Sequence, residues 1–185
     1  MYLVNSLKLI EKLKIWDAKK KIDTPFILWP KQKEFLQTIL SNKKVILLKK
    51  RQIGASQLTA ADSLVQCMAQ KNWTCLVLSI TQDDADEYLK RAYDMYLTLP
   101  DDIRAACPVK KNNSLMEFPW GSRLLSLSAS KGRSKTADRI IIDEAAWIKK
   151  LKSNVDLREV LLNVMPTLDL QQTDLIYFML SFWLA

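Results

Sequence analysis

The sequence predicts an α/β fold in which a mostly parallel sheet is flanked by helices. Three apolar runs, at residues 45–48, 73–80 and 139–142, have the length of strands, and segments with helical spacing separate them. The last run ends in three consecutive isoleucines, which suit a strand that is covered on both faces. Strands that alternate with helices along a chain form a parallel sheet with helices packed on its faces.

The composition limits the kinds of site that the chain can hold. With 185 residues, of which 49% are hydrophobic and 26% charged, the chain has the composition of one soluble globular domain. It contains no histidine, so imidazole plays no part in any catalytic or metal site. Cys67, Cys75 and Cys107 lack the spacing of metal ligands and are odd in number, so we expect reduced thiols in a cytosolic protein. No apolar run has the length of a membrane span.

The positive charge is concentrated near the N-terminus. Residues 1–50 contain 12 lysines and 4 acidic residues, whereas residues 51–185 contain 16 charges of each sign. A basic face suggests an anionic polymer such as nucleic acid as partner. Lysine-rich amphipathic helices are also common as ordinary solvated surface, and the charge alone leaves both interpretations open.

The N-terminal part is predicted to be helical. Apolar residues recur at helical spacing between lysines up to about Lys20, and Asp23-Thr24-Pro25 ends this helix. A second helix begins near Pro30, whose ring suits the first turn of a helix. We therefore divide the chain into a basic amphipathic helix at residues 1–24 and one domain at residues 25–185.

The rest of the chain continues the alternation of strands and helices. Helices are predicted at residues 57–70 and 82–99, the second with Thr81 as its N-cap. A β-hairpin is predicted around Pro119-Trp120-Gly121, from residues 114–118 and 122–127. After a polar loop come the isoleucine strand, helices at 145–150 and 157–164, and a last strand at 175–180.

The first apolar strand leads into a segment that resembles a phosphate-binding loop. The usual pattern is G-x-x-x-x-G-K-[ST], and Gly54 and Ser56 stand in register with it. Lys49 replaces the first glycine and Ala55 replaces the usual lysine, but an ammonium at the start of the loop can still reach the β- and γ-phosphates. The alternative is a surface turn between a strand and a helix. The residues expected to contact the nucleotide are Gln32, Lys49, Lys50, Arg51, Gln52, Gly54, Ala55, Ser56 and Gln57, and either Lys49 or Lys50 is the phosphate lysine.

A second motif lies 94 residues beyond Lys49, where the isoleucine strand ends in Asp143 and Glu144. Open α/β sheets bind ligands at the carboxyl ends of their strands. Asp143 would hold Mg²⁺ directly or through water, and Glu144 would polarise the attacking water. Acidic residues are also favoured at the N-terminus of a helix, so this pair is informative only together with the loop at Lys49. Together the two motifs predict an ATP site.

The segment before the loop has the composition of an adenine pocket. Phe26 to Trp29 offer an apolar wall, and Gln32 offers an amide that both donates and accepts hydrogen bonds. The alternative for Gln32 is an exposed helix residue. The tryptophans nearest the motifs, Trp29, Trp120 and Trp147, are expected to pack at the edges of the core.

With these residues in place, residues 26–174 resemble the N-terminal ATPase domain of a large terminase subunit, the DNA-packaging motor of tailed double-stranded DNA bacteriophages. The most specific part is Lys49-x-Arg51-Gln52-x-Gly54-x-Ser56, which is similar to that family's deviant Walker A loop with its lysine at the start. Gln32 and Asp143-Glu144-Ala145 match the family's glutamine and Walker B strand, and the segment from Arg133 to Asp138 matches a further family segment.

The resemblance implies a P-loop NTPase-like fold and a set of roles. Lys49 and Arg51 would contact the phosphates, Ser56 and Asp143 would ligate Mg²⁺, and Glu144 would be the catalytic carboxylate. Arg133 would be an arginine finger that reaches the ATP of a neighbouring subunit; contact with DNA and plain solvent exposure are its alternatives. The implied partners are double-stranded DNA, the small terminase subunit, the portal protein and further copies of the chain in a homo-oligomeric ring. The implied location is the cytoplasm of the bacterial host and, transiently, the procapsid portal. No membrane is implied.

The sequence departs from the family pattern near its end. The run from Leu180 to Ala185 has no Thr-Pro coupling motif, and no acidic nuclease domain follows, so we expect a truncated product or a prophage remnant. Two other functions remain open. A helicase-like translocase shares the glutamine, the loop and the acidic pair, and a non-hydrolysing module could hold DNA or a motor partner through the basic N-terminal region.

Overall fold

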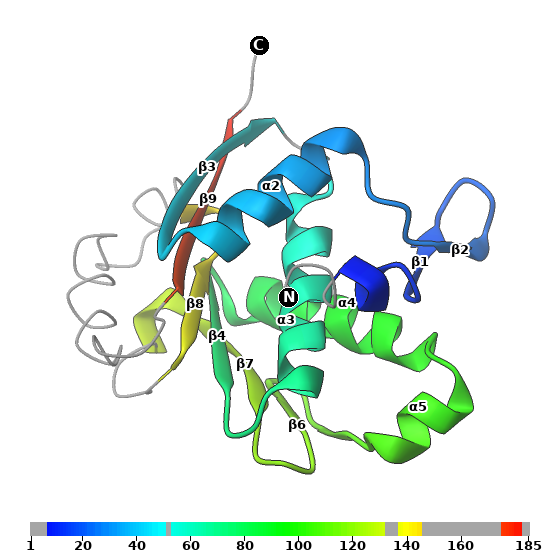
Figure 1. The fold of residues 1–185 in the computed structure, drawn as a ribbon. Helices are drawn as coiled ribbons and strands as arrows, with labels where there is room; N and C mark the ends of the chain where they lie inside the picture. Colours follow the sequence, from blue (N-terminus) through cyan, green and yellow to red (C-terminus); the bar gives the residue numbers. More distant parts are fainter. Residues whose placement is uncertain (1–6, 51–52, 132–136, 146–174, 183–185) are drawn as a thin grey trace.

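The computed structural model describes residues 7–50, 53–131, 137–145 and 175–182 (Figure 1). Its main feature is a seven-stranded sheet with the strand order β3-β9-β8-β4-β7-β6-β5. The strands are β3 (Lys44–Lys50), β4 (Thr74–Ser79), β5 (Lys110–Lys111), β6 (Leu115–Glu117), β7 (Arg123–Ser128), β8 (Arg139–Ile142) and β9 (Leu175–Phe182). All neighbours from β3 to β7 are parallel, and β7, β6 and β5 are antiparallel. The predicted α/β fold with a mostly parallel sheet and one β-hairpin, now β6–β7, is confirmed.

The order of the parallel strands brings the two predicted motifs to the same edge of the sheet. Strand β9 lies between β3 and β8, and Lys49 at the end of β3 is paired with Ser181. At the end of β8, Ile142 is paired with Phe178 of β9, and the backbone N–H of Asp143 donates to the carbonyl of Leu78 (2.9 Å). Because parallel strands end at a common edge, Lys49 and Asp143 meet there although they are far apart in the sequence.

In the described part of the chain after residue 25, four α-helices accompany the sheet, and the first three of them carry buried apolar residues. They are α2 (Pro30–Ser41), α3 (Ala55–Ala69), α4 (Gln82–Leu97) and α5 (Asp101–Ala106), which lie on the same side of the sheet in Figure 1. The helix α2 begins at Pro30 as predicted. The short helix α5 was not predicted, because Pro100 and the two aspartates after it indicate a helix end as readily as a new first turn.

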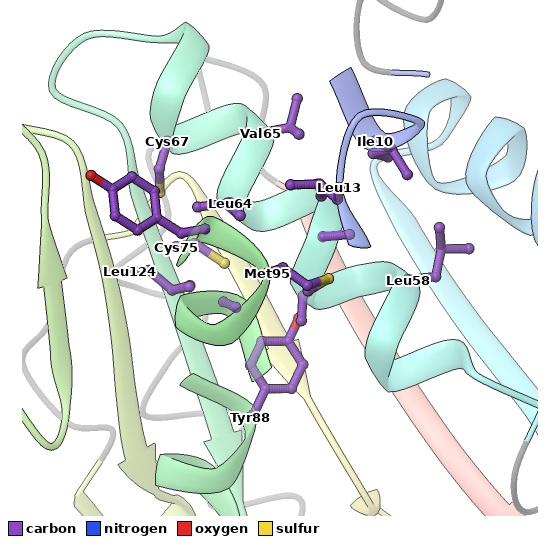
Figure 2. Close-up of a cluster of buried hydrophobic side chains, with 14 of the residues drawn as sticks. Ile10, Leu13, Leu58, Leu64, Val65, Cys67, Cys75, Tyr88, Met95 and Leu124 are labelled. Carbon is purple, nitrogen blue, oxygen red and sulfur yellow. The ribbon is translucent and has the colours of Figure 1, made fainter. Parts of the chain in front are cut away.

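The central strands are buried on both faces, as the isoleucine run predicts. Alternate residues of β4 and β8 belong to two separate apolar clusters, since successive side chains of a strand point to opposite faces. Cys75, Val77 and Ile141 pack against α3 and α4 in the larger cluster. Figure 2 shows part of that cluster, where Leu58 and Leu64 of α3 lie near Tyr88 and Met95 of α4 and near Ile10 and Leu13.

The three cysteines are free thiols buried in the core. Burial raises the pKa of Cys75 to about 11 and that of Cys107 to about 11, so both stay protonated and unreactive at neutral pH. These residues therefore act as small apolar side chains.

The helix predicted up to Lys20 is wrong beyond its first turn. Residues 7–10 are helical, but the chain then forms the antiparallel hairpin β1 (Lys14–Asp17) and β2 (Ile22–Pro25). The helical spacing of Leu7, Ile10 and Leu13 is real, since all three pack in or against the core. The helix does not continue to Lys20, because Asp17 accepts hydrogen bonds from the backbone N–H groups of Lys19 and Lys20 and so forms the turn of the hairpin. The helices predicted at 145–150 and 157–164 lie outside the described residues. None of the described helices combines the length and the apolar character needed to cross a bilayer.

A buried ion pair joins α3 to the start of β8. The guanidinium of Arg139 donates to the carboxylate of Asp62 and lies 5.0 Å from the ring centroid of Trp73, and both charged side chains are fully buried. The amide of Gln66 also donates to Asp62 (3.3 Å). Removing one member of such a pair leaves the other charge in the core without compensation.

We expect Asp62→Ala to lower the free energy of unfolding by about 3 to 5 kcal/mol, because it removes the carboxylate that pairs with the buried guanidinium of Arg139. Urea denaturation followed by circular dichroism measures this. The matched control is Asp94→Ala, which removes an exposed pair with Lys90 and should cost less than about 1 kcal/mol. Equal small losses in both variants would show that the buried pair is not needed for stability.

Candidate nucleotide-binding site

The described end of the loop between β3 and α3 consists of Ile53 and Gly54, directly before the N-terminus of α3. Gly54 has φ +72°, in the left-handed region, and stands immediately before the first residue of α3. Its carbonyl accepts the first helical hydrogen bond from the N–H of Leu58 (3.0 Å). The free N–H groups of the first turn of this 15-residue helix therefore point toward the end of β3. Arg51 and Gln52 lie outside the described residues.

Gln32 ties this loop to α2. Its amide oxygen accepts the N–H of Trp29 (3.0 Å), and its amide nitrogen donates to the carbonyl of Ile53 (3.2 Å). The left-handed φ angle of Gly54 favours glycine, and a Cβ atom there would come within 2.5 Å of the same amide nitrogen and displace the Gln32 side chain. Gln32 is buried, and not an exposed helix residue. Its contact with adenine through the remaining amide hydrogen stays a prediction.

The ends of β3 and β8 place an ammonium beside a carboxylate. The Nζ atom of Lys49 lies 4.0 Å from Oε1 of Glu144, and the Lys49 side chain is only 6% exposed. Glu144 has φ +55°, an uncommon conformation for a residue with a Cβ atom, and its N–H donates to Oδ1 of Asp143 (3.0 Å). Strained backbone of this kind is concentrated at functional sites. Here the residue with the strained backbone, Glu144, is also the one whose carboxylate lies beside Lys49.

Asp143 is a buried carboxylate whose surroundings do not fully compensate its charge. Burial raises the pKa of Asp143, and the neighbouring charge of Glu144 raises it further, whereas Lys49 and a hydrogen bond from Ser56 lower it. A bound cation would remove this imbalance.

The donors at this point fit Mg²⁺. Ser56 offers a hydroxyl oxygen and Asp143 a carboxylate oxygen, which are the hard ligands that Mg²⁺ prefers. Among the described residues, no group of three or more acidic or cysteine side chains could hold a metal ion.

A groove of about 480 Å³ lies beside Lys49, between α2 and β3. Its walls include Trp29, Phe35 and Ile53 together with Gln32. Trp29 is 61% exposed, so the expectation that it packs at the edge of the core is wrong. Trp120 does pack, since its indole N–H donates to the carbonyl of Cys67 (2.7 Å) and its ring stacks on Phe118.

The structure gathers most, but not all, of the predicted residues. Lys49, Ser56, Asp143 and Glu144 meet at one edge of the sheet, and Gln32, Gly54 and Ala55 adjoin them. The side chain of Gln57 points elsewhere: its amide donates to Sδ of Met95 (3.2 Å) and lines a separate groove of about 680 Å³ between β1 and α4. Because Gln57 stands in the first turn of α3, contact of its backbone N–H with a nucleotide stays a prediction. Lys50 is the last residue of β3. Arg133 and Trp147 lie outside the described residues.

Comparisons with known proteins agree on the fold. No family model and no curated protein matches the sequence. Among solved structures, the large terminase of bacteriophage HK97 is similar with a TM-score of 0.76 at 17% identity, over 96% of this chain and 37% of that one. The large terminase ATPase domain of Thermus phage P74-26 is similar with a TM-score of 0.62 at 18% identity, over 80% of this chain and 64% of that one. The chain thus spans little more than a third of the HK97 protein, and it has the α/β fold seen in large terminase ATPase domains.

Proposed function

We propose that this chain is the ATPase domain of a viral DNA-packaging motor, which binds Mg-ATP and couples its hydrolysis to the translocation of double-stranded DNA. The observation that carries the proposal is the meeting of Lys49, Ser56, Asp143 and Glu144 at the carboxyl edge of a parallel sheet. The similarity of the fold to large terminase ATPase domains supports a motor ATPase at the level of the family.

Each side chain has one task in this proposal. The ammonium of Lys49 binds the β- and γ-phosphates, and the first turn of α3 donates backbone N–H groups to them. Ser56 and Asp143 would hold Mg²⁺, which would supply positive charge to offset the negative charge that develops on the phosphates. Glu144 accepts a proton from the water that attacks in line with the leaving group.

The contact between Lys49 and Glu144 suggests how the site is kept inactive before it is loaded. At 4.0 Å the ammonium and the carboxylate attract one another, so the carboxylate is held beside Lys49. Phosphate oxygens compete for the same ammonium. When phosphate oxygens occupy the ammonium, Glu144 is released to act as a base.

The same proposal includes further residues and partners. Arg51 and Lys50 would be additional phosphate ligands, and Arg133 would be an arginine finger. The partners would be the portal protein, the small terminase subunit and a ring of copies of this chain.

Phosphate release by the purified chain, with and without duplex DNA, tests this function. We expect hydrolysis that requires Mg²⁺, is abolished by EDTA and rises when DNA is added. A fluorescent ATP analogue measures binding in parallel. If the analogue does not bind, the proposed site is wrong.

Binding without hydrolysis at saturating Mg-ATP would select a different function, a non-hydrolysing module that holds DNA or a partner. One feature favours it, because Ala55 is buried at the position where a phosphate loop usually carries its lysine. Salt-dependent DNA binding would then remain.

A further inference from the structure

The hairpin β1–β2 is a short ribbon that is firmly attached at its base. The backbone N–H of Lys14 donates to the side chain of Thr98 (2.9 Å) at the end of α4, and the N–H of Phe26 donates to the carbonyl of Leu13 (2.9 Å). Leu13 and Phe26 are themselves buried in the core. The ribbon therefore has a fixed position, and its tip extends away from the sheet (Figure 1).

The tip carries three consecutive exposed lysines, Lys19, Lys20 and Lys21. Adjacent like charges repel one another, and Lys21 also has φ +54°, where asparagine or glycine would be less strained. The nearest compensation is Asp17, whose carboxylate is 4.0 Å from Nζ of Lys20 and accepts two backbone N–H groups of the turn. A second carboxylate, Asp23, is on β2. Residues 14–25 thus carry four lysines and two aspartates, and the ribbon keeps an excess of positive charge.

In the part of the chain that the structure describes, the carboxylates of α4 nearest the ribbon already have cationic partners of their own. The carboxylates of α4 that line the groove beside the ribbon are Glu87 and Asp94, and they pair with Arg91 and Lys90 (3.7 and 2.5 Å). The ribbon also exposes apolar surface. Trp16 is 63% exposed, on the same solvent-facing side as Lys14. A cationic tip with an uncovered indole is suited to a polyanion that also has apolar surface.

We propose that the tip of the β1–β2 hairpin binds the backbone of double-stranded DNA. A two-stranded antiparallel ribbon is narrow enough to enter the major groove, and lysines at its tip can then reach phosphates on either side. Ammonium groups contact phosphates as point charges and read no sequence, so this contact is independent of sequence. Trp16 adds an apolar contact to sugars or base edges. The choice of duplex DNA rests on the proposed function, whereas the choice of a polyanion rests on the hairpin itself.

The experiment compares two variants of the full chain that have the same net charge. One is K19Q/K20Q/K21Q at the tip, and the control is K33Q/K43Q/K44Q, whose exposed lysines lie on α2 and at the start of β3. Fluorescence anisotropy with a labelled 30-base-pair duplex gives the affinity at several salt concentrations. We expect the tip variant to bind about ten- to a hundredfold more weakly at 150 mM salt, and the slope of log K against log salt to fall by roughly 2 to 3. The control should change the slope by less than about 1.

Equal losses in the two variants would overturn the proposal, because they would mean that only net charge matters. Unchanged binding by the tip variant would also overturn it. Vesicles with anionic lipids form a second arm, and a loss confined to vesicles would assign the tip to a membrane surface instead. Phosphate release without DNA separates this inference from the proposed function. It should be the same in the tip variant and the wild type, and its absence in both would count against the ATPase site alone.

Discussion

Glu144→Gln is expected to reduce the rate of ATP hydrolysis by about two to four orders of magnitude, which is the usual contribution of a positioned general base. Nucleotide binding should survive, because the substitution removes the base and keeps the shape. It should even become a few times tighter, since the carboxylate 4.0 Å from Lys49 no longer competes with phosphates for the ammonium. Single-turnover hydrolysis and titration with a fluorescent ATP analogue measure the two effects separately.

The matched control for this substitution is Glu117→Gln on β6, which makes the same chemical change on a distant part of the sheet. It should leave both the rate and the affinity unchanged. If Glu144→Gln hydrolyses ATP at the rate of the wild type, Glu144 is not the base. A parallel loss of binding and hydrolysis would instead indicate that Glu144 holds the site together.

Lys49→Ala has the second large effect that we expect, a loss of about 2 to 5 kcal/mol of ATP-binding free energy, because a nearly buried ammonium is removed from the phosphate site. Isothermal titration calorimetry measures it. Lys50→Ala decides between the two lysines of the motif, and Lys44→Ala at the other end of β3 controls for loss of charge. Retained affinity in Lys49→Ala together with a loss in Lys50→Ala would transfer the role to Lys50.

The same variant should also change how stability depends on pH. The pKa of Asp143 is already raised, mainly by burial, and Lys49 opposes that rise. A carboxyl group with a raised pKa in the folded state stabilises the protein at low pH and loses that contribution as pH increases through the raised value. Without Lys49 the loss should be larger. The unfolding temperature of Lys49→Ala should therefore fall further below that of the wild type at pH 7 than at pH 5. Mg²⁺ should restore part of the difference.

The central sheet could be predicted because its strands are strongly apolar. A run such as Ile140 to Ile142 fits few environments other than a doubly covered strand, and the residues that follow it are then placed at the ligand-binding edge. The position of β9 between β3 and β8 was not predictable, because pairing between distant strands is not visible in the periodicity of either one.

The errors also have physical causes. Leu7, Ile10 and Leu13 have helical spacing, but the turn made by Asp17 decides the conformation of residues 14–25. Gln57 follows Ser56 directly and so seemed part of the loop, yet consecutive helix residues point about 100° apart, and its amide reaches Met95 instead. Sequence proximity therefore does not bring the side chains of Ser56 and Gln57 to the same face of α3.

The position of β3 at the margin of the sheet has a consequence for how the molecule behaves in concentrated solution. Among the described residues, β3 pairs with β9 on one side only, and Ile46 and Leu48 are exposed. A seven-residue strand with an open row of backbone donors and acceptors is a template for strand addition by another molecule. Self-association of the isolated chain should therefore begin at this margin, a few residues from Lys49, so that oligomer formation and access to the nucleotide site become linked.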